Sequence, residues 1–110
     1  MESCPTHFFH IASKDDFEAA GHTGTYSCTS LKTEGFIHCC FDHQLSGVIE
    51  RYYRGVSELL LLTIDVAGLE SDVKYENTVG GTELFPHVYG PINLDSVSGS
   101  RDLDTSSGLI

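Results

Sequence analysis

The stretch ELFPHVYGP, residues 83–91, brings an acid, an imidazole, a phenol and two prolines together more closely than any other part of the chain. Successive side chains of an extended backbone point to opposite sides, so a strand here places Phe85, His87 and Tyr89 on one face. The Gly90-Pro91 pair is typical of a turn and ends that strand. We therefore predict a strand with one face that carries binding or catalytic side chains.

Two further short segments each carry a histidine among apolar residues. HFFHIA contains His10, and GFIHCC contains His38. A single histidine on an apolar strand is more often a core residue bonded to backbone than a ligand. Three such strands in one small chain favour a shared site. We therefore expect His10, His38 and His87 to line one cleft, with Tyr89 at its edge.

The periodicity along the chain predicts an α+β fold. Apolar residues recur at the spacing i, i+3, i+4 and i+7 after Asp42, so we expect a helix over residues 42–54. Residues 59–66 are apolar on both faces of a strand, which is typical of a central strand. The predicted inner face of the 42–54 helix consists of Leu45, Val48, Ile49 and Tyr52. The other expected elements are strands over 7–12, 35–40, 73–76, 85–89 and 92–97, a helix after Ser13, and a loop over 22–34.

Length and composition indicate a single domain. The chain has 110 residues, close to the commonest domain size. From Ser98 onward, serine, aspartate, threonine and glycine dominate, a composition typical of a mobile polar segment. We expect a globular domain over residues 1–97 and a flexible polar tail over residues 98–110.

The charge balance excludes some partners. A formal net charge of −10, from 16 acidic and 6 basic residues, repels a phosphate backbone, so broad nucleic-acid binding is not expected. No apolar run approaches the ~20 residues that a bilayer span needs, so we expect no membrane partner. The amino terminus has neither the basic nor the apolar region of a secretory signal, which predicts a cytoplasmic location. A small-molecule ligand is the partner that we expect.

Four cysteines, Cys4, Cys28, Cys39 and Cys40, have no regular framework spacing, and we expect free thiols. Cys39 and Cys40 are neighbours on a predicted strand and point to opposite faces, so they do not form a metal pair in the manner of a Cys-x-x-Cys motif. Their simplest interpretation is that of small buried apolar side chains.

Several motifs together resemble a known family. They are Gly35-Phe36-Ile37-His38, the strand LLLLTID, and Gly80-Gly81 followed by LFPHVYGP. With these motifs the chain resembles, from about residue 7 to residue 97, the family known as domain of unknown function nine-five-two. That family in turn resembles the ADP-ribosyltransferase fold. The resemblance implies two small, mainly antiparallel sheets with two flanking helices, and a nicotinamide-dinucleotide cleft between the sheets.

The resemblance also implies roles for particular side chains and a cofactor, NAD. It implies a catalytic His38, together with Glu76 or Glu83 near the mouth of the cleft as the acid that polarises the nicotinamide ribose. It also implies that His10 holds the adenine-side ribose. The ligand-binding residues expected on this basis are His10, Phe36, His87 and Tyr89.

Three function classes follow from these observations. The first is an ADP-ribosyl transferase or NAD glycohydrolase, in which a carboxylate and an imidazole stabilise an oxocarbenium-like centre. The second is a non-catalytic module that binds a nucleotide or another small anion through its histidines. The third is a divalent-metal site built by the three imidazoles, although no local spacing indicates a metal. The expectation common to the first two is a histidine-lined cleft that binds a nucleotide-like ligand.

Overall fold

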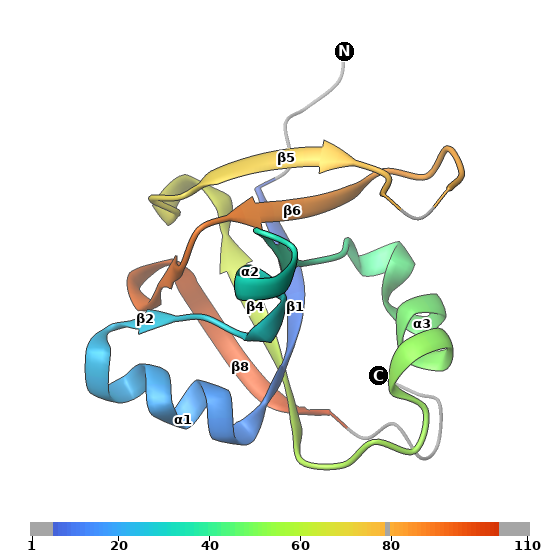
Figure 1. Ribbon diagram of the computed structural model, residues 1–110. Coiled ribbons are helices and arrows are strands. Elements are labelled where there is room, and N and C mark those ends of the chain that lie inside the picture. The colour runs from blue at the N-terminus through green and yellow to red at the C-terminus, as the bar shows by residue number, and fades with distance from the viewer. Residues whose placement is uncertain (1–5, 79, 104–110) are drawn as a thin grey trace.

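The leucine-rich run after Glu58 forms the middle strand of a three-stranded antiparallel sheet in the computed structural model, which describes residues 6–78 and 80–103 (Figure 1). This strand, β4 (Leu59–Asp65), pairs with β1 (His7–Ser13) on one side and β8 (Val97–Leu103) on the other. Leu59, Leu61, Leu62 and Ile64 are all buried. Because these leucines pack on both faces of the sheet, the prediction of a central strand with two apolar faces is confirmed.

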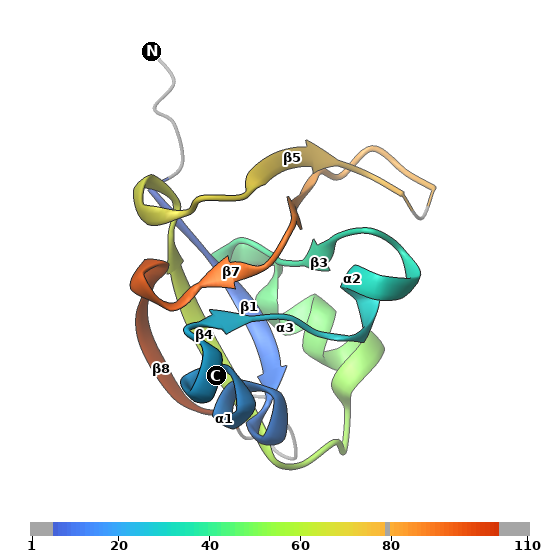
Figure 2. The ribbon, with the colours of Figure 1, turned by 60° about the vertical axis from the view of Figure 1, so that its left-hand side comes forward.

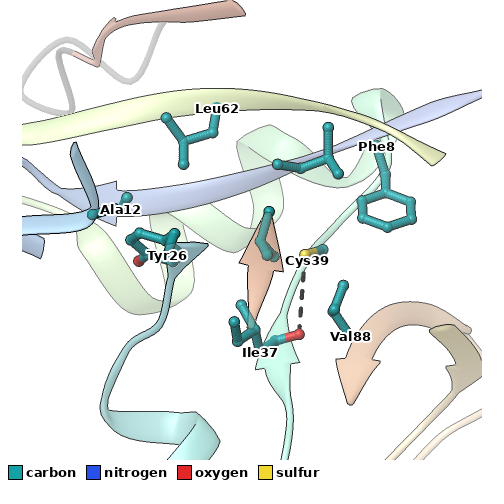
Figure 3. Packing of buried hydrophobic residues seen from close by; sticks show 10 residues of the cluster. Phe8, Ala12, Tyr26, Ile37, Cys39, Leu62 and Val88 are labelled. Carbon is teal, nitrogen blue, oxygen red and sulfur yellow. Dashed lines mark hydrogen bonds between the residues drawn. The ribbon is translucent and has the colours of Figure 1, made fainter. Parts of the chain in front are cut away.

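Two hydrophobic cores lie on opposite faces of this sheet. The first contains Phe8, Ala12 and Leu62 together with Ala20 of helix α1 (Lys14–Thr23). The close view shows these strand residues beside Ile37 and Val88 of a smaller sheet (Figure 3). The second contains Ile11 and Leu61 and packs against the helical segment after Phe41. Adjacent residues of β1 therefore enter different cores, as strand alternation requires.

Two smaller antiparallel sheets complete the fold. In one, β6 (Phe85–Tyr89) lies between β3 (Ile37–His38) and β5 (Asp72–Glu76). The other pairs β2 (Thr25–Tyr26) with β7 (Ile92–Asn93), as the turned view shows (Figure 2). The architecture is thus α+β with small antiparallel sheets and few helices. The expected number of two sheets is wrong for the described residues, because the β2–β7 ladder forms a third.

Helix α1 begins where the sequence predicts. The Ser13 hydroxyl caps it by accepting a hydrogen bond from the Asp16 backbone N–H at 3.1 Å. The predicted loop over residues 22–34 also contains β2 and a short helix, α2 (Thr29–Thr33). The strand predicted over residues 35–40 is shorter than expected, since only two residues pair in β3.

The helix predicted over residues 42–54 consists of three consecutive segments. They are a 3-10 turn, η1 (Asp42–Gln44), an α-helical turn, α3 (Leu45–Val48), and a π-helical turn, η2 (Ile49–Tyr53). A π-helix closes its hydrogen bonds one residue later than an α-helix, so the inward face advances by one residue. Tyr53 therefore packs on the second core, and Tyr52, predicted to point inward, is 57% exposed.

The predicted polar tail also needs correction. Residues 98–103 belong to β8, which pairs with β4 from Val97 to Leu103. A ladder is made by backbone groups, and most side chains of β8 are exposed, so a polar composition does not prevent pairing. Residues 104–110 lie outside the described part of the chain. Similarly, the strand predicted over 92–97 is interrupted by a 3-10 turn, η4 (Leu94–Ser96).

The turn after β6 depends on Gly90. Its φ is 158°, and a Cβ atom at this position would lie 2.5 Å from the Ser71 Oγ. That hydroxyl donates a hydrogen bond to the Pro91 carbonyl at 2.7 Å, which holds the start of β5 beside the end of β6. The Tyr-Gly-Pro part of the motif thus sets the β5–β6 geometry. Within residues 6–78 and 80–103, no helix has the length and apolarity to cross a bilayer.

Candidate functional site

The predicted face of β6 is present, and its central histidine is held by a carboxylate. His87 is 3% exposed, and its Nδ1 lies 2.9 Å from Glu76 Oε2 on the neighbouring strand β5. Glu76 is opposite Phe85 in the ladder, so its carboxylate reaches His87 diagonally. The Tyr89 hydroxyl donates a hydrogen bond to the same carboxylate oxygen. One carboxylate therefore links two of the three side chains on this face.

These hydrogen bonds hold Glu76 in its ionised form. The bonds from Tyr89 and His87 lower the pKa of the Glu76 carboxyl below its usual value. The same contact raises the pKa of the Tyr89 phenol, so Tyr89 keeps its proton. An ionised carboxylate only accepts hydrogen bonds, so the proton of neutral His87 lies on Nδ1.

Aromatic contacts fix the plane of the His87 ring. Phe36 stacks on it, with ring centroids 4.2 Å apart and an angle of 18° between the planes. Phe36 also meets His38 edge to face at 4.8 Å and Tyr89 at 5.2 Å. Phe36 is itself 6% exposed. Its role in this arrangement is to hold the imidazole.

His38 lies next to His87, as the antiparallel register of β3 and β6 requires. The two ring centroids are 5.2 Å apart. His38 is exposed, and its Nε2 lies 3.1 Å from a carboxylate oxygen of Glu34 and 3.2 Å from the other. Each of the two neighbouring imidazoles thus has its own carboxylate partner.

Both imidazoles line a cleft of about 470 Å³ between β3, β6 and the helical segment η2. The wall opposite the imidazoles is formed by Arg51, Tyr52 and Tyr53 of the π-helical turn. π-Helical turns are rare and occur often at functional sites. The remaining lining residues are Phe9, Ile11, Glu34, Cys39, Cys40, Val48, Thr78 and Phe85.

The cleft contains a cation that no carboxylate of the described residues neutralises. In the described part of the chain, the ion pairs involve Lys14, His38 and His87, and none involves Arg51. The Arg51 guanidinium lies 6.0 Å from the centroid of the Tyr52 ring. In a chain with a net charge of −10, such a group favours a ligand with an anionic part.

His10 does not line this cleft, contrary to prediction. It shares a face of β1 with Phe8 and Ala12, whereas Phe9 and Ile11 on the opposite face line the cleft. His10 is 5% exposed, and its Nδ1 donates to the His38 carbonyl at 2.6 Å. Its Nε2 accepts a hydrogen bond from the buried Tyr26 hydroxyl at 2.8 Å. His10 therefore binds the backbone of His38 on the side of β1 that faces away from the cleft.

This position predicts a loss of stability in acid. Burial lowers the pKa of His10 from 6.5 to about 4, so the unfolded chain binds a proton that the folded chain does not. The contribution of neutral His10 to the free energy of unfolding is fully present above pH 6.5, and it is lost as the pH falls towards 4. We expect a loss of about 3 kcal/mol over this window. Urea unfolding of the wild type and of His10→Gln should show it, because glutamine keeps both kinds of hydrogen bond but does not titrate. Equal acid losses in the two proteins would contradict this assignment.

Neither of the two predicted acids lines the cleft. Glu76 is bonded to Nδ1 of His87 and is not among the lining residues. Glu83 is exposed and accepts a hydrogen bond from Gln44 Nε2 at 3.1 Å. The Gln44 amide also donates to the Leu84 carbonyl at 2.9 Å. Glu83 thus helps to attach the segment before β6 to η1. The carboxylate that does line the cleft is Glu34, at the end of the predicted loop over residues 22–34.

The three imidazoles do not form a metal site. The ring nitrogens of His10 are both bonded within the protein, and in the described ranges no three His, Cys, Asp or Glu side chains converge as metal ligands. Cys28, Cys39 and Cys40 are free thiols, as predicted, and Cys4 lies outside the described residues. Burial raises the pKa of Cys40 to about 12 and that of Cys39 as well, which disfavours a thiolate nucleophile in the cleft.

A second hollow, of about 320 Å³, lies beside α1. Short side chains such as Ala19, Thr23 and Ser27 line it, with Asp16 and Lys32 as its charged groups. None of its described lining residues is aromatic, so they provide no ring on which a planar ligand could stack. The cleft beside His87 is therefore the stronger candidate site.

Three parts of the site could not be identified from the sequence. Arg51 and Tyr53 belong to the segment for which the sequence predicts a helix with a period of 3.6 residues, and the π-helical turn changes which residues face the cleft. Tyr26 lies in a segment without periodicity, so its bond to His10 had no signal. Glu34 precedes His38 by four residues, but that spacing predicts a side-chain contact only within a helix, and His38 lies on a strand.

Comparison with known proteins agrees with the motifs. The model of the family described as "Protein of unknown function (DUF952)" matches residues 11–100. A crystal structure of protein CC0527 from Caulobacter crescentus is similar, with a TM-score of 0.80 and 31% identity over 90% of this chain and 87% of that one. The solution NMR structure of CC0527 gives a TM-score of 0.77 and 31% identity over 91% and 86% of the two chains. No protein with curated annotation matches the chain.

Proposed function

The chain belongs to the DUF952 family, and we propose that its cleft binds a nucleotide-like ligand. The ligand lies between η2 and the strands that carry His38 and His87. The observation that carries this proposal is Arg51, a cation without a carboxylate partner among the described residues, in a cleft with aromatic walls. A guanidinium suits a phosphate, and the rings of Tyr53 and Phe85 suit a planar base or nicotinamide.

We further propose NAD or ADP-ribose as the ligand class. The support for this choice is the resemblance of the family to the ADP-ribosyltransferase fold, together with a cleft volume of about 470 Å³, which lies within the range of small-molecule sites. The chemistry proposed on this basis is ADP-ribosyl transfer or hydrolysis of the nicotinamide ribosyl bond.

A second candidate is binding without catalysis. It is favoured by the positions of Glu76 and Glu83, which do not line the cleft, and by the pairing of Glu34 with His38. An acid free to polarise the ligand ribose is therefore missing from the lining among the described residues. Wild-type protein that binds NAD but releases no nicotinamide would favour this candidate.

Ligand binding is expected to raise the stability of the wild type. NAD, ADP-ribose or AMP at about 100 times its dissociation constant should add about 2.7 kcal/mol to the free energy of unfolding. Arg51→Met should weaken the affinity about tenfold or more, because a charge-assisted hydrogen bond contributes about 1.5–3 kcal/mol. Urea unfolding with and without the ligand measures the gain in stability, and isothermal titration calorimetry measures the affinity.

Arg54→Met is the matched control. Arg54 is an exposed neighbour that does not line the cleft, so its replacement removes the same charge without removing the proposed contact. An equal loss of affinity in the two variants would mean that the overall charge, rather than the cleft, attracts the ligand. Absence of binding to all three compounds at millimolar concentration would contradict the proposed function.

A further inference from the structure

The side chains around His87 leave one of its two nitrogens available. Nδ1 donates to Glu76, as the ionised carboxylate requires. In the part of the chain that the structure describes, Nε2 has no hydrogen-bond partner, and no buried side-chain nitrogen or oxygen lacks one. Nε2 is therefore not buried, and His87 is one of the residues that line the cleft. The cleft thus contains an imidazole nitrogen with a free lone pair.

The neighbouring histidine is less suited to accept a proton. The Nε2 of His38 is already bonded to both oxygens of Glu34, and the side chain is exposed. His87, by contrast, is buried, lines the cleft and is stacked on Phe36. A general base needs a fixed orientation and a third group that holds it, and Glu76 is such a group.

We propose that His87 is the general base of the cleft, and that Glu76 and Tyr89 are positioning residues that hold its lone pair towards the bound ligand. This inference rests on the proposed function. It moves the catalytic role from His38, where the motif resemblance places it, to His87. It also gives Glu76 a role through the imidazole and not through direct contact with the ribose.

The step that His87 performs is the activation of a hydroxyl acceptor, either water or an alcohol. The oxygen of the acceptor forms a bond to C1′ of the nicotinamide ribose. The C1′–N bond breaks, and its electron pair leaves with nicotinamide, which becomes neutral. The acceptor's proton passes to Nε2 of His87, and the resulting imidazolium is stabilised by the Glu76 carboxylate. Release of that proton to solvent regenerates the neutral base.

The groups that face His87 set the expected pH dependence. On β5, Glu76 is bonded to it and Lys74 is opposite it in the ladder, with the Lys74 ammonium 4.7 Å from the centroid of the Tyr89 ring. From β3, His38 lies 5.2 Å away between ring centroids, with Glu34 as its partner. The other charged or titratable groups that line the cleft are Arg51, Tyr52, Tyr53, Cys39 and Cys40.

Two measurements test the proposal. The first is the tautomer of His87, read from long-range ¹H–¹⁵N NMR correlations of the free protein, for which we expect a proton on Nδ1 and none on Nε2. The second is nicotinamide release from NAD, for which His87→Gln should lower kcat about 10²–10⁴-fold. Glu76→Gln removes the carboxylate that stabilises the imidazolium, so it should lower kcat and shift the acidic limb of the pH profile to lower pH, together with the ¹⁵N titration of His87. Tyr89→Phe keeps the carboxylate charge, so it should change kcat less than Glu76→Gln and should not move the acidic limb to lower pH.

His22→Gln is the control, because His22 lies in the last turn of α1 and does not line the cleft. Melting temperatures near that of the wild type show that a loss of kcat is not a loss of fold. A proton on Nε2, or nicotinamide release that persists in folded His87→Gln, overturns the proposal. NAD binding without nicotinamide release in the wild type also overturns it but leaves the proposed ligand binding intact, whereas absence of binding overturns both.

Discussion

Replacing His10 with alanine is expected to lower the free energy of unfolding by about 3–5 kcal/mol, as for other large buried rings. The imidazole is 5% exposed and satisfies two buried groups, the His38 carbonyl and the Tyr26 hydroxyl. Its removal leaves a cavity and deprives both groups of their partner, and each unsatisfied group costs about 1–3 kcal/mol. Urea unfolding at pH 7.5 or above, where His10 is neutral in both states, measures this effect without a contribution from titration.

His22→Ala provides the comparison for His10→Ala. His22 is exposed, and such a replacement usually changes stability by about 0.5 kcal/mol or less. If His10→Ala changed stability as little as His22→Ala, His10 would not be the buried link between β1 and β3. The His10→Ala variant should also alter the cleft through His38, whose carbonyl loses its support.

The second large effect is expected at the helical segment. Ile49 is 3% exposed in the second core, so Ile49→Ala should cost about 2–5 kcal/mol. Tyr52, three residues later, is 57% exposed, and Tyr52→Ala should cost far less in spite of its larger side chain. Chemical denaturation of both variants compares them directly.

This pair of variants discriminates between two helix periods. An α-helical continuation would place Tyr52 on the inner face with Ile49, whereas the π-helical turn places Tyr53 there. A loss of stability at Tyr52 as large as that at Ile49 would contradict the π-helical turn. Tyr52 would then face the second core and could not line the cleft.

The sequence could predict those elements in which local pattern and burial agree. Strand β4 is buried on both faces, so its apolar run was sufficient to place it at the centre of a sheet. Strand β6 places the apolar side chains of Pro86 and Val88 on one face and those of Phe85, His87 and Tyr89 on the other. Its two faces were therefore distinguishable, and the structure confirms that His87 and Tyr89 lie close enough to share the Glu76 carboxylate.

The direction in which β1 presents His10 could not be predicted. Both faces of β1 are buried, one in each core. The alternation of side chains therefore shows that His10 and Phe9 lie on different faces of the strand, but it does not show which face adjoins the cleft. Strand β8 gave no apolar signal, because its pairing with β4 is made by backbone groups while its side chains are mostly exposed. In both cases tertiary pairing decides what the local pattern leaves open.

The central claim is that a nucleotide-like ligand occupies the cleft between η2 and His87, and residue-resolved NMR titration with ADP-ribose tests it most directly. We expect the largest shifts on the side chains of His38, His87 and Tyr53 and on the Arg51 guanidinium, because all four line the cleft. Shifts confined to the hollow beside α1, around Thr23 and Ser27, or no saturable shifts at all, would contradict it.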